Sequence, residues 1–169
     1  MGSGTEQNHP PVEIVRAELD RPDHSAAVLD LLDAFAREPV SGGRPLPREV
    51  REELIPGLRS HPTTLILLAR KDGRFIGAAI CFTGFSTFRA RPLINIHDLT
   101  VLDSHRGQGI GRRLLRAVEA EAREMGCCRV TLEVWNENLG ARRLYGSEGY
   151  RGDGSTGGGS YFFMQKELA

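Results

Sequence analysis

The chain has 169 residues, 40% of them hydrophobic and 7% aromatic, and its 22 lysines and arginines balance 22 aspartates and glutamates. This length is typical of one globular domain with a sizeable core. A net charge of zero gives no electrostatic reason to expect nucleic acid or a membrane surface as a partner. The sequence also contains no run of about eighteen apolar residues, so no segment is expected to span a membrane.

Three cysteines, two of them adjacent (Cys127 and Cys128), make neither a disulfide framework nor a metal site of the CxxC type. We therefore expect reduced thiols in a cytoplasmic protein, with no bound metal. Residues 1–11 are polar and are expected to form a disordered tail, whereas residues 12–169 are expected to form a single domain.

The first half of the chain predicts a strand, two helices and three further strands. The strand is expected over residues 12–19, and Asp23 can cap a helix whose apolar stripe is Val28, Leu31, Leu32 and Phe35. Pro47 suits the first position of a second helix, which Pro56 should kink or end early. The next strands are expected at residues 63–69, 75–85 and 93–102, with a hairpin turn at 72–73 joining the first two.

The second half predicts a helix, a strand, a short helix and a final strand, over residues 111–125, 130–135, 139–147 and 161–166. The first of these helices has a clear apolar face, made by Leu114, Leu115, Val118, Ala122 and Met125. Residues 152–160 are rich in glycine and are expected to form a mobile loop. This order of elements predicts one α/β domain built on a mixed sheet.

The segment Arg106-Gly107-Gln108-Gly109-Ile110-Gly111 lies between a predicted strand and a predicted helix. Its glycines let backbone N–H groups converge, and the helix that follows adds the positive end of its dipole, so the segment suits a phosphate or pyrophosphate. Arg106 and Arg112 can add charge-assisted hydrogen bonds to the same oxygens.

Three other interpretations of this segment are considered. It could be a plain glycine-rich turn. A P-loop would end in Gly-Lys-Ser/Thr, but Arg112-Arg113 stands in that place. A dinucleotide-binding fingerprint would need a glycine three residues after Gly109, and it would need a β-α-β unit that the preceding sequence does not offer.

With Leu99-Thr100-Val101 before it, this segment resembles the acetyl-CoA signature of the GNAT superfamily of N-acetyltransferases. Farther along, the run from Asn138 through Ala141, Leu144 and Tyr145 to Gly149-Tyr150 is similar to the second conserved segment of that family. The resemblance covers about residues 95–150. It implies the GNAT fold, a mostly antiparallel, twisted α/β sheet that is flanked by helices and whose central strands are splayed.

The resemblance also implies acetyl-CoA as the cosubstrate. The backbone of Leu99, Thr100 and Val101 would hold the pantetheine arm, and Asn138 would contact the cofactor beyond the splayed strands. The pyrophosphate would rest on the amides of residues 107–112, which are Gly107, Gln108, Gly109, Ile110, Gly111 and Arg112.

Transfer in this family is a direct attack of an amine on the thioester, and Tyr145 stands where the family commonly has the acid that protonates the departing thiolate. A packing role is the alternative for this tyrosine. For the base we favour Asp98, on the premise that it shares a strand face with Ile94 and Ile96 and has a raised pKa there. His97, Glu133 or an ordered water could serve instead.

The acceptor is expected to be a primary amine of a small molecule or a peptide. Trp135, Phe82, Phe85 and Phe88 could line its pocket, although core packing is the ordinary role of such side chains, and Arg89 and Arg91 are expected to be solvated in a turn. Pairing of two copies through a sheet edge would give a homodimer. A module that binds acyl-CoA without turnover is the alternative function.

Overall fold

The computed structural model describes residues 11–152 and 160–168. The predicted tail of residues 1–11 lies outside the described residues except for Pro11. Most of the predicted glycine-rich loop, residues 153–159, lies outside them as well.

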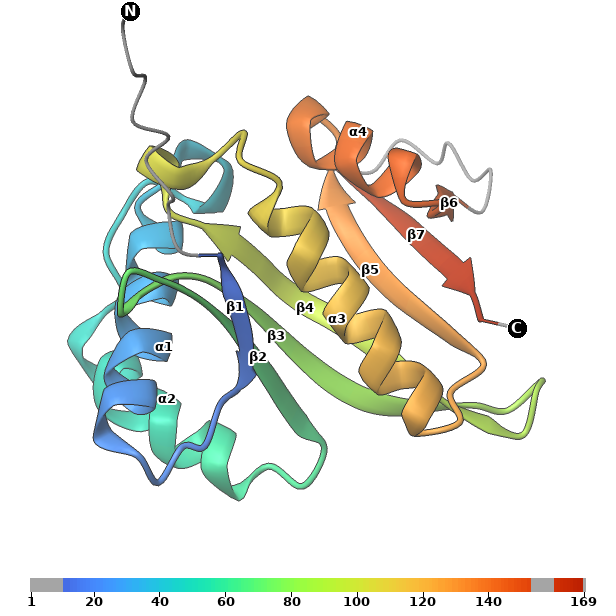
Figure 1. The fold of residues 1–169 in the computed structure, drawn as a ribbon, viewed down its shortest axis with the longest axis horizontal. Coiled ribbons are helices and arrows are strands. Elements are labelled where there is room, and N and C mark those ends of the chain that lie inside the picture. Colours follow the sequence, from blue (N-terminus) through green and yellow to red (C-terminus); the bar gives the residue numbers. More distant parts are fainter. Residues whose placement is uncertain (1–10, 153–159, 169) are drawn as a thin grey trace, which may run out of the picture.

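A seven-stranded sheet with the strand order β1-β2-β3-β4-β5-β7-β6 runs through the described chain (Figure 1). Every neighbouring pair is antiparallel except β4 and β5, which are parallel. The predicted mixed, mostly antiparallel sheet is therefore confirmed, and the two-residue β6 is an additional strand. The strands are β1 (Glu13–Arg16), β2 (Thr64–Lys71), β3 (Arg74–Ser86), β4 (Arg91–Val101), β5 (Arg129–Trp135), β6 (Arg151–Gly152) and β7 (Tyr161–Glu167).

Helices pack on both faces of this sheet (Figure 1). On one face α1 (Pro22–Ala36) and α2 (Arg48–Ser60) share a core cluster with β2 and β3. On the other face α3 (Ile110–Glu124) and α4 (Leu139–Ser147) pack on strands from β2 to β7. The predicted apolar stripe of α3 makes this second layer through Leu114, Leu115, Val118 and Ala122, which are completely buried. Met125 was predicted to belong to the stripe, but it is the C-cap of the helix and is 42% exposed. Two single-turn helices, η1 (Pro39–Ser41) and η2 (Asp103–His105), complete the described elements.

Two details of the helices differ from the predictions. Arg21, not Asp23, is the N-cap of α1, because the helix begins at Pro22, and Asp23 pairs with Arg21 from inside the first turn. The helix α2 runs past Pro56 to Ser60. A proline there removes one backbone donor, but Leu58 on the following turn is buried in the core beneath α1, and this packing keeps the helix intact.

A β-bulge interrupts the pairing of β3 with β4 at His97. Ile96 lies opposite Cys81, whereas Asp98 lies opposite Ile80, so His97 is the extra residue. Cys81 belongs to the core beneath α3 and Ile80 to the core beneath α1 and α2. The expectation that Asp98 shares a face with Ile94 and Ile96 is therefore wrong, because a bulge breaks the two-residue alternation on which it rested.

The strands β4 and β5 form a fork. They pair only from Ile94 opposite Val130 to Ile96 opposite Leu132. Beyond this point β4 continues to Val101 along β3, and β5 continues to Trp135 along β7. The edge of β4 that faces the fork is therefore unpaired with strand from His97 onward, at the end of the strand that leads into the glycine-rich segment.

Candidate functional site

The glycine-rich segment forms an open cradle at the start of α3. Gly107 and Gly109 have φ values of 74° and 77°, a left-handed conformation that glycine adopts without strain. Gly109 is the N-cap of α3 and lacks a side chain that could satisfy the first N–H groups of the helix. These N–H groups and the helix dipole favour an anion.

A cavity of about 690 Å³ opens beside this cradle. Its wall includes every residue that the sequence assigned to the cofactor except Gln108, whose side chain amide accepts a hydrogen bond from Lys71 at 3.0 Å. The other contributors come from the end of α1, from η1 and its N-cap, from η2 and from α4. The lining residues are Phe35, Glu38, Val40, Leu99, Thr100, Val101, His105, Arg106, Gly107, Gly109, Ile110, Gly111, Arg112, Asn138, Gly140, Ala141, Arg143, Leu144, Tyr145 and Ser147.

The two arginines assigned to phosphate oxygens already have protein partners. Arg106 donates to the carbonyl of Val101 at 3.0 Å and forms an ion pair with Glu38. Glu38 follows α1 and lies in the cavity wall, so this ion pair fastens the α1–η1 segment to the cradle. The sequence offered no signal for it, because the two residues are 68 positions apart.

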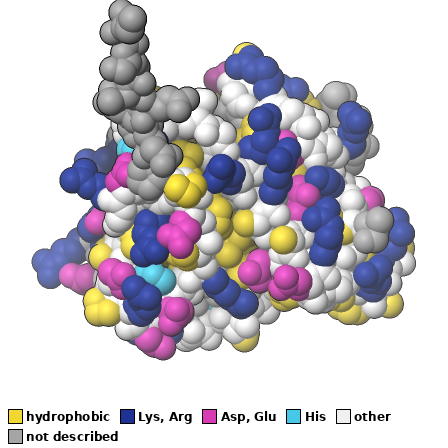
Figure 2. All heavy atoms as spheres, viewed as in Figure 1, with side chains coloured by type: hydrophobic (Ala, Val, Ile, Leu, Met, Phe, Trp, Pro, Cys, Tyr) yellow, Lys and Arg dark blue, Asp and Glu magenta, His cyan; other side chains and the backbone are white. Residues whose placement is uncertain are grey.

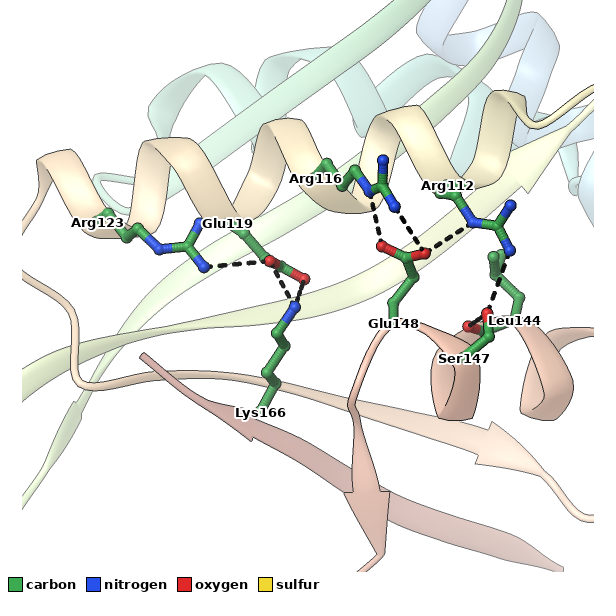
Figure 3. A network of polar contacts seen from close by, with 8 residues as sticks. All are labelled: Arg112, Arg116, Glu119, Arg123, Leu144, Ser147, Glu148 and Lys166. Atoms are coloured by element: carbon green, nitrogen blue, oxygen red, sulfur yellow. Dashed lines mark hydrogen bonds and ion pairs between the residues drawn. The ribbon is translucent and has the colours of Figure 1, made fainter. Parts of the chain in front are cut away.

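Arg112 is held in a second group of charges between α3 and the C-terminal end of α4 (Figure 3). Its Nε lies 2.7 Å from Glu148, and the same carboxylate lies 2.8 Å from Nε of Arg116. The Glu148 side chain is only 7% exposed. The hydrogen bond from Arg116, together with the charges of both arginines, lowers the pKa of Glu148 despite its burial. No local pattern in the sequence points to this carboxylate, which ties the helix of Tyr145 to the cradle.

A matching contact lies one turn farther along α3, where Lys166 on β7 is 2.7 Å from the buried Glu119 (Figure 3). Arg123 approaches the same carboxylate at 3.4 Å. Figure 2 shows lysine and arginine side chains on the surface over α3 and α4, with acidic side chains among them. Part of this positive charge is therefore neutralised by carboxylates that hold the helices together.

Asn138 and Tyr145 belong to α4, beside the cradle. The Asn138 side chain caps the helix by accepting a hydrogen bond from the Ala141 amide at 3.1 Å, and the residue also lines the cavity. Tyr145 lies two helical turns later, is 7% exposed and lines the same cavity. Burial, with a smaller contribution from the charge of Asp98, raises the pKa of Tyr145 to about 12.

Asp98 is an electrostatic neighbour of Tyr145, although it is not among the residues that line the cavity. Burial raises its pKa, and the adjacent His97 opposes this rise. The pKa of the Cys81 thiol is also raised, first by burial and then by Asp98. The expectation of a raised Asp98 pKa therefore agrees with the structure, whereas its predicted place on the strand does not.

His97 and Glu133 are exposed at the fork. The residues just before them, Asn95 and Thr131, are joined by a hydrogen bond of 3.1 Å between their side chains. The His97 ring packs against Phe82 with centroids 5.7 Å apart, on the face that carries α1 and α2. Since side chains alternate along a strand, Glu133 lies on the same face as Thr131.

The other aromatic side chains divide between core and solvent. Phe82 packs against the core beneath α1 and α2, as the core interpretation predicted. Phe85 and Phe88 are 63% and 99% exposed, which contradicts a core role for them. Arg91 donates to the carbonyl of Gly126, and Arg89 pairs with Glu167, so both turn arginines have partners.

Cysteine and acidic side chains give no sign of a metal centre in residues 11–152 and 160–168. No group of three or more histidine, cysteine, aspartate or glutamate side chains there could hold an ion. All three cysteines are buried free thiols, as expected. None of the described helices is both long and apolar enough to cross a membrane.

Comparison with known proteins gives this geometry a context. Residues 27–150 match the model of the acetyltransferase (GNAT) family. An uncharacterized N-acetyltransferase of Archaeoglobus fulgidus is 37% identical over 98 residues, which cover 56% of this chain and 65% of that protein. An uncharacterized N-acetyltransferase of Bacillus subtilis is 34% identical over 96 residues, which cover 57% of this chain and 64% of that protein. The match thus spans just under two thirds of each relative.

Among solved structures, a chain in the crystal structure of the NatC complex bound to Gag peptide and CoA superposes with a TM-score of 0.72. The similarity covers 95% of this chain and 100% of that chain, with 19% sequence identity. At that identity the likeness shows a shared fold.

Proposed function

The chain belongs to the acetyltransferase (GNAT) family, and from that premise we propose that it transfers the acetyl group of acetyl-CoA to a primary amine. The observation that carries the proposal is the single cavity wall shared by the cradle at the start of α3, the unpaired edge of β4 and Tyr145. An anion site, a free strand edge and a buried acid in one cavity suit a long cofactor in which an extended arm joins a pyrophosphate to a terminal thioester.

In this proposal the pyrophosphate rests on the free N–H groups at the start of α3. The pantetheine arm lies along the edge of β4 from Leu99 to Val101, where no neighbouring strand pairs. Arg106 already occupies the carbonyl of Val101, so the amides and the other carbonyls remain to hold the arm. Arg106 and Arg112 keep their carboxylate partners and supply positive potential at the cradle.

Tyr145 is proposed as the donor to the departing thiolate. Its hydroxyl belongs to a buried ring in the cavity wall, and its high pKa keeps it protonated at physiological pH. The thiolate and the hydroxyl then meet in a site with little water, where a hydrogen bond to a developing charge is strong.

The amine must lose a proton, and two carboxylates near the fork are candidates to accept it. Asp98 is half-buried, and desolvation raises its pKa, which brings its basicity closer to that of a base working at neutral pH. Glu133 is exposed at the fork, where an amine can arrive from solvent. We propose that the amine proton leaves through one of these carboxylates. The pH–rate profiles of Asp98→Asn and Glu133→Gln distinguish the two, because only the variant that lacks the proton acceptor should lose the acid limb.

Binding and turnover test the proposal separately. Gly109→Trp should abolish binding of CoA, measured by calorimetry, because the new side chain fills the cradle. Gly126→Trp is the matched control: Gly126 has a φ of 70°, has no atom within 4 Å of its would-be Cβ, and lies at the opposite end of α3. Equal affinity in Gly109→Trp and the control would contradict the cradle assignment.

Turnover is measured as release of free CoA thiol from acetyl-CoA in the presence of a panel of amines. Thiol release that depends on the amine supports acetyl transfer. Tight CoA binding with no release on any amine would favour the non-catalytic, sensing function instead.

A further inference from the structure

Strands β5 and β7 present two unlike faces beyond the fork. Leu132 and Val134 on β5, and Phe162 and Met164 on β7, pack into the core beneath α3 and α4. The residues between them point to the opposite face, because side chains alternate along a strand. Four of these make a continuous group, which we call the open-face patch, and they are Glu133, Trp135, Tyr161 and Phe163.

The patch is defined by two adjacent cross-strand pairs. Glu133 lies opposite Phe163, and Trp135 lies opposite Tyr161. The core cluster beneath α1 and α2 contains side chains of β2 and β3, and none of its described members comes from β5 or β7. Tyr161 and Phe163 are accordingly 62% and 38% exposed. Neighbouring exposed aromatic rings of this kind mark a binding surface more often than isolated ones do.

The position of the patch connects it to the proposed reaction. Leu132 is the last β5 residue that pairs with β4, so Glu133 is the first residue of β5 beyond the fork. The unpaired edge of β4, which the pantetheine arm would follow, begins at the same point. The patch therefore starts where the thioester would lie and extends away from it, across β5 to β7.

The chemistry of the patch is a single carboxylate beside three aromatic rings. Within residues 11–152 and 160–168, the carboxylate of Glu133 has neither a hydrogen bond nor an ion pair, so its charge is available to a ligand. A carboxylate attracts an ammonium group, and aromatic faces attract cations and apolar groups. The same carboxylate would repel an acceptor that carries a phosphonate or carboxylate near its amine.

Strand geometry gives the spacing. Rings on the partner strand and two residues along lie roughly 5–7 Å from Glu133, since strands are about 4.8 Å apart and each residue adds about 3.3 Å. A ligand can therefore place its ammonium group at Glu133 and its own aromatic ring against these side chains if two or three carbon atoms link the two groups.

We propose that the open-face patch selects arylalkylamines, that is, primary amines with an aromatic ring two or three carbons away and no neighbouring anionic group. The proposal rests on the acetyl transfer proposed above. Glu133 holds the ammonium at the fork, and Trp135, Tyr161 and Phe163 hold the ring. Acetyl transfer forms an amide on the acceptor nitrogen, releases the CoA thiol and transfers the amine proton to the protein.

The experiment compares kcat/KM for four amines, which are 2-phenylethylamine, ethylamine, 2-aminoethylphosphonate and glucosamine. We expect 2-phenylethylamine to exceed ethylamine by roughly 10- to 100-fold, the usual gain from an added apolar contact, and the phosphonate and the sugar to fall below ethylamine. Phe163→Ser and Tyr161→Ser should remove most of this advantage and leave ethylamine unchanged. Phe85→Ser, on an aromatic ring that is 63% exposed at the far hairpin, is the matched control and should change neither.

Equal rates for the phenyl and ethyl amines, a preference for the phosphonate or the sugar, or equal losses on all amines in Phe163→Ser would overturn the proposal. Calorimetry of 2-phenylethylamine with the CoA-saturated protein gives a readout that needs no turnover. Absence of binding there overturns the patch assignment. A third outcome is that the wild type binds 2-phenylethylamine, Phe163→Ser does not, and the wild type turns over none of the amines. This outcome supports the patch and refutes acetyl transfer.

Discussion

Replacing Tyr145 by phenylalanine should lower kcat by about two to four orders of magnitude, the range expected when a general acid is lost. The KM for acetyl-CoA should change little, because the aromatic ring stays in the cavity wall and only the hydroxyl is removed. The structure sharpens this expectation through the pKa of about 12 that burial and the charge of Asp98 give to Tyr145.

The raised pKa decides how Tyr145 can act. A thiol has an ordinary pKa of about 8.5, so full transfer of the phenolic proton to a thiolate is uphill by about 3.5 pK units, or about 5 kcal/mol. A free tyrosinate therefore does not accumulate. Tyr145 must donate a hydrogen bond to the developing thiolate, and any proton it gives must be replaced as the ammonium of the acceptor loses its own.

The sign of the pH dependence follows from the same value. An acid works while it is protonated, so the contribution of Tyr145 is present below its pKa and is lost only as the pH rises through about 12. Between about pH 6 and pH 10 the profiles of the wild type and Tyr145→Phe should thus run parallel. They should differ by a constant factor and share the same alkaline limb.

The assay is thiol release at saturating amine across that pH range, and Tyr150→Phe is the matched control. The Tyr150 ring lies 6.0 Å from the Tyr145 ring in the same core, but it does not line the cavity. Equal losses in the two variants would show that the effect is packing. An alkaline limb that is present in the wild type and missing in Tyr145→Phe would refute the pKa argument.

Three further predictions concern the fold and the proton acceptor. Gly77→Ala should destabilise the protein by about 1–3 kcal/mol in urea unfolding, because its Cβ would lie 2.9 Å from the Thr100 carbonyl; Gly57→Ala, in open space on α2, should be neutral or stabilising. Glu148→Gln should make the free energy of unfolding fall less steeply with decreasing pH. A carboxyl whose pKa is lowered in the folded state stabilises the fold above about pH 4.3, and this stabilisation is lost as the pH falls through the pKa of the folded state. An unchanged dependence of stability on pH in acid would contradict this. Asp98→Asn should remove an acid limb that lies above the ordinary aspartate range if Asp98 accepts the amine proton, and an unaltered limb assigns the proton to another group.

Local sequence patterns were sufficient to predict most elements. The apolar stripe of α3 up to Ala122, the Asp72-Gly73 turn with φ values of 52° and 74°, and the order of all strands and helices except the two-residue β6 agree with the structure. These features depend on residues a few positions apart, so periodicity and turn chemistry determine them. Local rules failed at Pro56, where packing of the next helical turn outweighed the loss of one backbone donor.

The bulge at His97 is the most consequential feature that the sequence did not reveal. Alternation along β4 placed Asp98 with Ile96, but the register against β3 moves it to a position opposite Ile80. A bulge depends on how two strands pair, so residues 94–98 alone do not predict it. The ion pairs of Glu38 with Arg106 and of Glu148 with Arg112 could not be predicted either, because each joins residues that are distant in the chain.

The sequence by itself determined the cradle, because glycines followed directly by an amphipathic helix create an anion site within a few consecutive residues. Tertiary structure decided what surrounds that cradle. The fork between β4 and β5, the carboxylates that hold Arg106 and Arg112, and the open face with Glu133 beside three aromatic rings all bring together residues that are distant in the chain. Such contacts are set by the packing of the whole sheet, and the local sequence does not encode them.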